Sequence, residues 1–166
     1  LHAPQYTFRA SGMDLELLDW LNTYTFPQEA RYEDTEFAKE AYSIFTEDMK
    51  KSPNTRACIF GTLHVPATEI LMEQLDKTGI KAMVGKVNMD RNGSPQLQEE
   101  SAQASADATV QWIKDTLDKF ENVKPILTPR FTPSCSDELM EKLSEIQKRY
   151  HLPMQSHLCL LYTSPS

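Results

Sequence analysis

The chain has 166 residues, with 17 basic and 24 acidic side chains and a formal charge of −7, which is the length of one domain. With 40% hydrophobic and 25% charged residues its composition is globular, and the acidic balance argues against nucleic acid or an anionic membrane as the main partner. No apolar run reaches the roughly 18 residues of a bilayer span and no signal peptide is evident, so we expect a cytoplasmic protein with reduced thiols at Cys58, Cys135 and Cys159.

The first fifty residues differ in pattern from the rest of the chain. Residues 1–8 are typical of a strand end that runs into a loop. Apolar spacing predicts two helices, over 14–22 and 35–49, joined by a link that contains Pro27.

From about residue 54, short apolar runs alternate with stretches of helical period. The runs are continuous rather than alternating, which is typical of strands buried on both faces of a parallel sheet. They predict strands over residues 57–62, 82–87, 123–128 and 152–157.

Three helices are predicted between these strands. The first has Pro66 in its first turn and ends near Gly79. The second runs from about Pro95 to Phe120, and the third begins at a cap near 134–136 and ends near Tyr150. This order predicts βαβ units, and therefore an α/β fold with a parallel sheet.

Each predicted strand delivers a polar side chain at or just past its carboxyl end. These side chains are His64, Asp90, Arg130 and His157. In a (β/α)₈ barrel this end of the strands carries the active site. Loop starts are commonly polar, so the four residues together favour a site more than any one alone.

Three short segments carry a family resemblance: residues 1–6 (LHAPQY), 127–131 (LTPRF) and 155–158 (QSHL). In this combination and order they resemble guanine deaminases of the amidohydrolase superfamily. The stretches at 24–27, 37–38, 84–87 and 89–90 are also similar to that family. The resemblance covers residues 1–158.

The resemblance implies an incomplete, N-terminal and central part of a zinc-dependent (β/α)₈ TIM barrel, roughly its first five strands. It implies hydrolysis of guanine to xanthine and ammonia, with Zn²⁺ as cofactor, and a homodimer for the full-length protein. Two alternatives stay open. One is a deaminase of another aminated heterocycle, such as a cytosine or a triazine. The other is a non-catalytic binding protein that keeps the amidohydrolase fold.

The same resemblance assigns residues to roles. His2 is similar to the second histidine of the family's HxH motif and His157 to a further zinc ligand. Gln5 and Arg130, with Phe131 beside it, match positions that hold the purine. An amide pairs with a donor and an acceptor of a heterocycle, and a guanidinium fork donates to a carbonyl oxygen.

Other reactive residues have no such assignment. We expect His64, His151 and Cys58 to be structural, since no motif claims them. Asp90 is similar to a family position, without an assigned role.

The chain departs from the family at its C-terminal end. The family's general acid/base glutamate falls at Leu160, and because leucine cannot carry a proton, no catalytic residue is retained. Residues 159–166 resemble a translated sequencing adapter, so we expect a barrel fragment over 1–158 and a non-native tail over 159–166; a natural frameshifted end is the alternative. We expect the isolated chain to be unstable or to aggregate, to bind zinc poorly and to lack deaminase activity.

Overall fold

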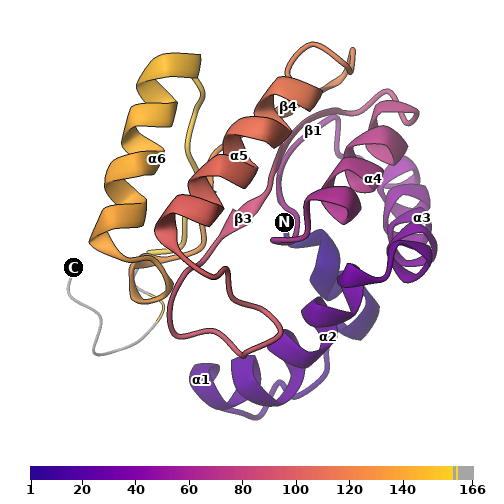
Figure 1. Ribbon diagram of the computed structural model, residues 1–166. Coiled ribbons are helices and arrows are strands. Elements are labelled where there is room, and N and C mark those ends of the chain that lie inside the picture. The colour runs from indigo at the N-terminus through magenta and orange to yellow at the C-terminus, as the bar shows by residue number, and fades with distance from the viewer. Residues whose placement is uncertain (159, 161–166) are drawn as a thin grey trace.

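The computed structural model describes residues 1–158 and 160 and confirms an α/β fold built on parallel strands (Figure 1). Strands β1 (Arg56–Phe60), β2 (Lys81–Gly85) and β4 (Val123–Pro125) form one parallel sheet in the order β1-β2-β4. Strands β3 (Val87–Asn88) and β5 (Thr128–Pro129) form a second parallel pair. Two predicted strands, over 82–87 and 123–128, therefore each divide between the two sheets.

Three helices precede β1, two lie between the strands and one follows β5. Their bounds are α1 Leu17–Trp20, α2 Phe26–Ala30, α3 Thr35–Lys51, α4 Val65–Asp76, α5 Ala102–Thr116 and α6 Asp137–Tyr150. Helix α3 packs on α4, and α5 packs on α6 (Figure 1). Among the described residues, no helix has both the length and the apolar character needed to cross a membrane.

Local sequence signals explain where several helices begin and end. The Asp34 carboxylate accepts from the backbone N–H of Glu36 and caps α3, and the Ser136 hydroxyl accepts from Leu139 N–H and caps α6. Pro66 lies in the first turn of α4, as predicted, and Gly79 follows this helix with a φ of +78°.

The N-terminal segment differs from its prediction. Residues Ala3–Phe8 form a 3₁₀ helix instead of a loop, and only His2 makes a β-bridge, to Phe60. The predicted non-helical link around Pro27 is wrong. Leu21–Thr25 form a π-helical turn, and Pro27 lies in the first turn of α2. Helical backbone runs from α1 through this π turn into α2, so the proline does not end the helical segment.

Two further boundaries are corrected. Helix α5 begins at Ala102, not near Pro95, because the Ser101 hydroxyl caps it and residues 95–101 form a loop that buries Leu97. Residues 152–157 do not form a regular strand. They make only isolated parallel bridges, Leu127 with Met154 and Phe131 with His157.

The buried apolar side chains form two clusters. The larger joins α3, α4, α5 and α6 to the three-stranded sheet. The smaller lies below the carboxyl ends of the strands and is built by Leu21, Phe26, Phe60, Val87, Met89 and Leu97. Leu21 of this second cluster, and the side chains of Leu17, Trp20 and Phe131 that pack against it, line the candidate site.

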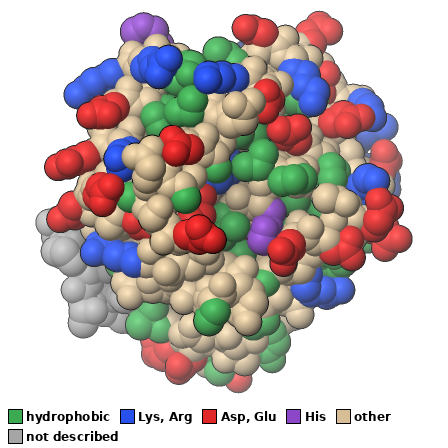
Figure 2. Space-filling view, in the orientation of Figure 1, with side chains coloured by type: hydrophobic (Ala, Val, Ile, Leu, Met, Phe, Trp, Pro, Cys, Tyr) green, Lys and Arg blue, Asp and Glu red, His purple; other side chains and the backbone are tan. Residues whose placement is uncertain are grey.

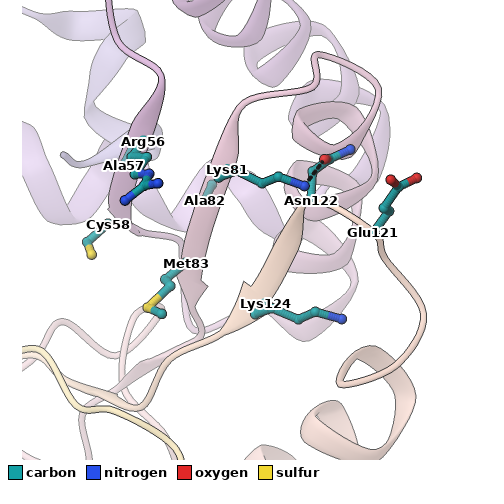
Figure 3. Close-up of a pocket in the computed structure, with 9 residues that line it drawn as sticks. All are labelled: Arg56, Ala57, Cys58, Lys81, Ala82, Met83, Glu121, Asn122 and Lys124. Carbon is teal, nitrogen blue, oxygen red and sulfur yellow. Dashed lines mark hydrogen bonds between the residues drawn. The ribbon is translucent and has the colours of Figure 1, made fainter.

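One face of the β1-β2-β4 sheet is open at the amino end of its strands (Figure 3). Cys58, Met83 and Lys124 are register partners on this face, and Met83 is 38% exposed. Elsewhere, acidic and basic side chains are interspersed over the surface shown in Figure 2. Parallel sheets are normally covered on both faces, so exposure of Cys58 and Met83 on this open face favours association of the isolated chain.

We expect the isolated 166-residue chain to associate and to melt without a cooperative transition, as measured by light scattering and calorimetry. Met83→Lys should shift it toward monomer, because it places a charge on the open sheet face. Ile44→Lys, which changes an exposed side chain on α3, is the matched control and should leave association unchanged. A monodisperse, cooperatively melting wild-type monomer would contradict this account.

Candidate functional site

The candidate site is a cavity of about 200 Å³ beyond the carboxyl ends of the strands. It is lined by His2, Gln5, Leu17, Trp20, Leu21, Arg130, Phe131, His157 and Leu160. A larger hollow of about 410 Å³ lies at the amino ends of β1, β2 and β4, around Cys58 and Met83, and contains no histidine (Figure 3). Because barrel enzymes place their chemistry at the carboxyl ends, the smaller cavity is the candidate.

Two histidines from opposite ends of the chain meet at this cavity. The Nε2 atoms of His2 and His157 are 2.8 Å apart. The His2 ring stacks on Phe60, with centroids 4.5 Å apart and an angle of 18° between the planes, and the His157 ring also contacts Phe60. The apolar contact and the β-bridge of His2 to Phe60 hold both imidazoles in place.

The tautomer of His157 follows from its other nitrogen. His157 Nδ1 lies 3.0 Å from the carbonyl oxygen of Arg130. A carbonyl only accepts hydrogen bonds, so Nδ1 carries the proton and donates it, which leaves the Nε2 lone pair of His157 directed at His2. This arrangement is typical of a histidine prepared to ligate a metal through Nε2.

Burial keeps both imidazoles neutral. Desolvation, aided by the nearby Arg130 guanidinium, lowers the pKa of His2 well below its ordinary value of 6.5. Desolvation also lowers the pKa of His157, partly opposed by its hydrogen bond to Arg130. Neutral imidazole is the form that binds a metal, so the pair is available as ligands at neutral pH.

A buried ion pair forms the wall beside the histidines. Arg130, directly after β5, is 4% exposed and Glu29, in α2, is 2% exposed. Arg130 Nη1 donates to Glu29 Oε2 over 2.6 Å and Nη2 to Oε1 over 3.2 Å. Gln5 Nε2 also donates to Glu29 Oε1, over 3.0 Å. The three side chains therefore form one connected polar group.

The apolar part of the cavity comes from α1 and the following turn together with Phe131 and Leu160. Phe131 is held by its bridge to His157. Leu160 reaches the cavity, so the position at which the family resemblance expects a glutamate faces the same space as the histidines.

The structure thus brings His2, Gln5, Arg130, Phe131 and His157 to one cavity. Sequence reasoning missed Glu29, although it follows the stretch 24–27 that carries part of the resemblance. It had no means of pairing Glu29 with Arg130, which lies 101 residues further along the chain.

Four other noted residues lie apart from this group. Asp90 accepts from the backbone N–H of Ser136 over 2.7 Å and so supports the start of α6. His64 precedes α4, His151 follows α6 with a φ of +54°, and Cys58 lies on the open sheet face.

The chemistry of the histidine pair fits a divalent metal, since two neutral imidazoles bring their Nε2 atoms to within 2.8 Å of each other. Within residues 1–158 and 160, no cluster of three or more metal-ligating side chains occurs. Catalytic zinc sites generally have at least three protein ligands. The described part of the chain therefore presents two such side chains at this point, fewer than a catalytic zinc site has.

A parallel α/β sheet whose strand ends carry paired histidines and a substrate-sized cavity is typical of barrel-type metal-dependent hydrolases. The chain belongs to the amidohydrolase family, whose model matches residues 1–164. Members that deaminate guanine are generally metal-dependent.

Relatives with curated names and solved structures are similar to this chain along most of its length. It is 45% identical to the guanine deaminase of Rattus norvegicus over 159 residues, covering 95% of this chain and 35% of that protein. The crystal structure of guanine deaminase from C. acetobutylicum with bound guanine in the active site superposes with a TM-score of 0.91 at 48% identity, covering 95% of this chain and 37% of that one.

The E. coli guanine deaminase structure superposes with a TM-score of 0.85 at 32% identity, covering 96% of this chain and 36% of that one. A triazine hydrolase structure, at 14% identity and a TM-score of 0.78, shares the fold alone. The chain spans about a third of the length of these guanine deaminases.

In the metal-free full-length protein that contains this chain, we expect His2 and His157 to titrate below pH 6.5, as followed by the imidazole proton signals in NMR. As the pH falls through 6.5, the unfolded chain binds protons before the folded pair does, so the free energy of unfolding decreases with falling pH. Titration of both rings above 6.5 would show that the burial argument is wrong.

Proposed function

We propose that this chain is part of a metal-dependent guanine deaminase, which hydrolyses guanine to xanthine and ammonia. The observation that carries the proposal is the shared cavity of about 200 Å³, which has the His2–His157 pair on one wall and Gln5 with Arg130 on another. The sequence and structural similarity to named guanine deaminases supports the choice of substrate.

His2 and His157 are the proposed metal ligands, and zinc is the proposed ion. A bound divalent ion lowers the pKa of water so that hydroxide is available near neutral pH. The role of His157 Nδ1–H is to fix its ring against the Arg130 carbonyl, so that Nε2 faces the ion. Phe60 keeps both rings aligned and excludes solvent from one side.

Gln5, Arg130 and Phe131 are the proposed purine-binding residues. Arg130 donates through the N–H groups that its pairing with Glu29 leaves free, and a purine carbonyl oxygen accepts from them. Phe131 adds apolar surface at the cavity wall. These contacts orient the ring so that its amino-bearing carbon can approach the histidine pair.

Position 160 is the proposed place of the general acid/base. Leu160 lines the cavity, and a carboxyl group there could pass a proton to the leaving ammonia. We propose that residues 1–158 are the barrel segment and that 159–166 are a non-native tail. Residues 159 and 161–166 of that tail lie outside the described part of the chain.

We propose a cytoplasmic protein that acts on a small purine base. The acidic composition supports the expectation that nucleic acid and anionic membranes are not its main partners. The family resemblance supports a homodimer for the full-length protein.

We expect the full-length protein, with glutamate at position 160, to release ammonia from guanine and to lose that activity on treatment with a metal chelator. Arg130→Lys should lower kcat/KM for guanine about tenfold to a hundredfold, because a single ammonium cannot reproduce the paired donors of the guanidinium. Ammonia release from guanine, cytosine and a triazine is the measurement. Faster turnover of cytosine or the triazine would favour the alternative substrate class.

A second expectation concerns position 160 by itself. The full-length protein with leucine at position 160 should turn over guanine about 10²–10⁴ times more slowly than the same protein with glutamate there, because only glutamate supplies a proton-transfer group. Binding of xanthine should be similar in both proteins, as measured by calorimetry. Equal turnover would show that the proton passes through another group.

A further inference from the structure

We infer that Glu29 is a positioning residue, which sets the orientation of the Gln5 amide and compensates the positive charge of Arg130. As a result, the cavity selects an uncharged heterocycle that has a carbonyl oxygen beside a ring N–H. This inference rests on the proposed function and adds a residue to its recognition machinery. Glu29 is not among the residues lining the cavity, and it acts through the two side chains that do line it.

The contacts of Glu29 account for its burial. Oε2 accepts from Arg130, and Oε1 accepts from both Arg130 and Gln5, at 2.6, 3.2 and 3.0 Å. A buried carboxylate without such partners would be strongly destabilising, and these three hydrogen bonds together with the facing charge compensate it. Arg130 also lies over the ring of Phe26, with its guanidinium carbon 5.3 Å from the centroid, so both partners are anchored by α2.

The first consequence concerns Gln5. An ionised carboxylate only accepts hydrogen bonds, so the amide NH₂ of Gln5 faces Glu29 and the amide oxygen takes the other position. Within the described part of the chain, no group donates to Gln5 Oε1. Gln5 lines the cavity, and the amide orientation that Glu29 selects leaves its oxygen to accept from a ligand N–H.

The second consequence concerns Arg130. Pairing through both terminal nitrogens uses two of the five guanidinium N–H groups and leaves the others for a ligand oxygen. The cavity wall therefore offers an acceptor from Gln5 and donors from Arg130. A 6-oxopurine presents the complementary pair, a ring N–H beside a carbonyl oxygen, whereas a 6-aminopurine presents the reverse pair.

The third consequence concerns charge. Glu29 and Arg130 cancel each other inside a nearly dry wall, so the cavity attracts neither an anion nor a cation strongly. Without the carboxylate, the buried guanidinium would favour an anionic ligand. Xanthine, the product, ionises more readily than guanine, so the carboxylate also disfavours retention of the product anion.

The test uses the full-length protein with glutamate at position 160, and compares Glu29→Gln, Glu29→Asp and the control Glu99→Gln. Glu99 is a suitable control because it forms a similarly buried ion pair, with Lys86, and does not line the cavity. The readouts are KM and kcat for guanine, the inhibition constant of xanthine at a pH where it is an anion, and that of the uncharged hypoxanthine.

We expect Glu29→Gln to raise KM for guanine about tenfold or more with a smaller change in kcat, and to tighten inhibition by the xanthine anion relative to hypoxanthine. Glu29→Asp keeps the charge but is shorter by one methylene. It should raise KM by about threefold or more and leave the xanthine-to-hypoxanthine ratio unchanged, so it tests the inference even where Glu29→Gln fails to fold. Glu99→Gln should lower thermal stability and change neither KM nor that ratio.

The possible failures are distinct. A background with glutamate at position 160 that releases no ammonia from guanine would overturn the proposed function, and this inference with it. An active background in which both Glu29 variants retain KM and the inhibition ratio would overturn the inference alone. Equal shifts in the Glu99→Gln control would also overturn it, because the effect would then belong to any buried ion pair.

Discussion

The buried Glu29–Arg130 ion pair connects the helical N-terminal segment to the sheet. Its two members lie 101 residues apart, in α2 and directly after β5, and both are almost inaccessible to water. Removing two charges from water is costly, and only close, well-aligned partners offset that cost. The position of α2 is thereby coupled to the end of β5, and the cavity between them has a defined wall.

Arg130 organises the site through its backbone as well as its side chain. Its carbonyl oxygen accepts from the backbone N–H of His157 over 3.0 Å and lies 3.0 Å from His157 Nδ1. Its own N–H donates to the Asn88 carbonyl at the end of β3. Arg130 thus supplies the side chain that faces the proposed substrate, and its carbonyl oxygen holds the His157 ring that faces the proposed metal. Displacement of Arg130 would disturb both.

Local patterns in the sequence were sufficient for the parts of the fold that rest on local physics. Asp34, Ser136 and Gly79 mark helix ends through hydrogen bonds and backbone angles formed within a few residues. The error at 95–101 has a tertiary cause, because burial of Leu97 and the pairing of Glu99 with Lys86 hold that segment as a loop. Glu29 was missed for the same reason. Family resemblance, not periodicity, identified His2, Gln5, Arg130, Phe131 and His157 as one group.

The described residues contain more of the proposed purine-binding groups than of the groups proposed for metal binding and proton transfer. The proposed substrate contacts, Gln5, Arg130 and Phe131, and their support Glu29 all lie within residues 5–131. By contrast, the described residues present two histidines that are proposed metal ligands and a leucine at the position proposed for proton transfer. The Glu29 carboxylate is satisfied by hydrogen bonds from Arg130 and Gln5, so this wall can form without the metal. A protein with this segment could therefore bind a purine without converting it, and purine binding and ammonia release report on separate parts of the site.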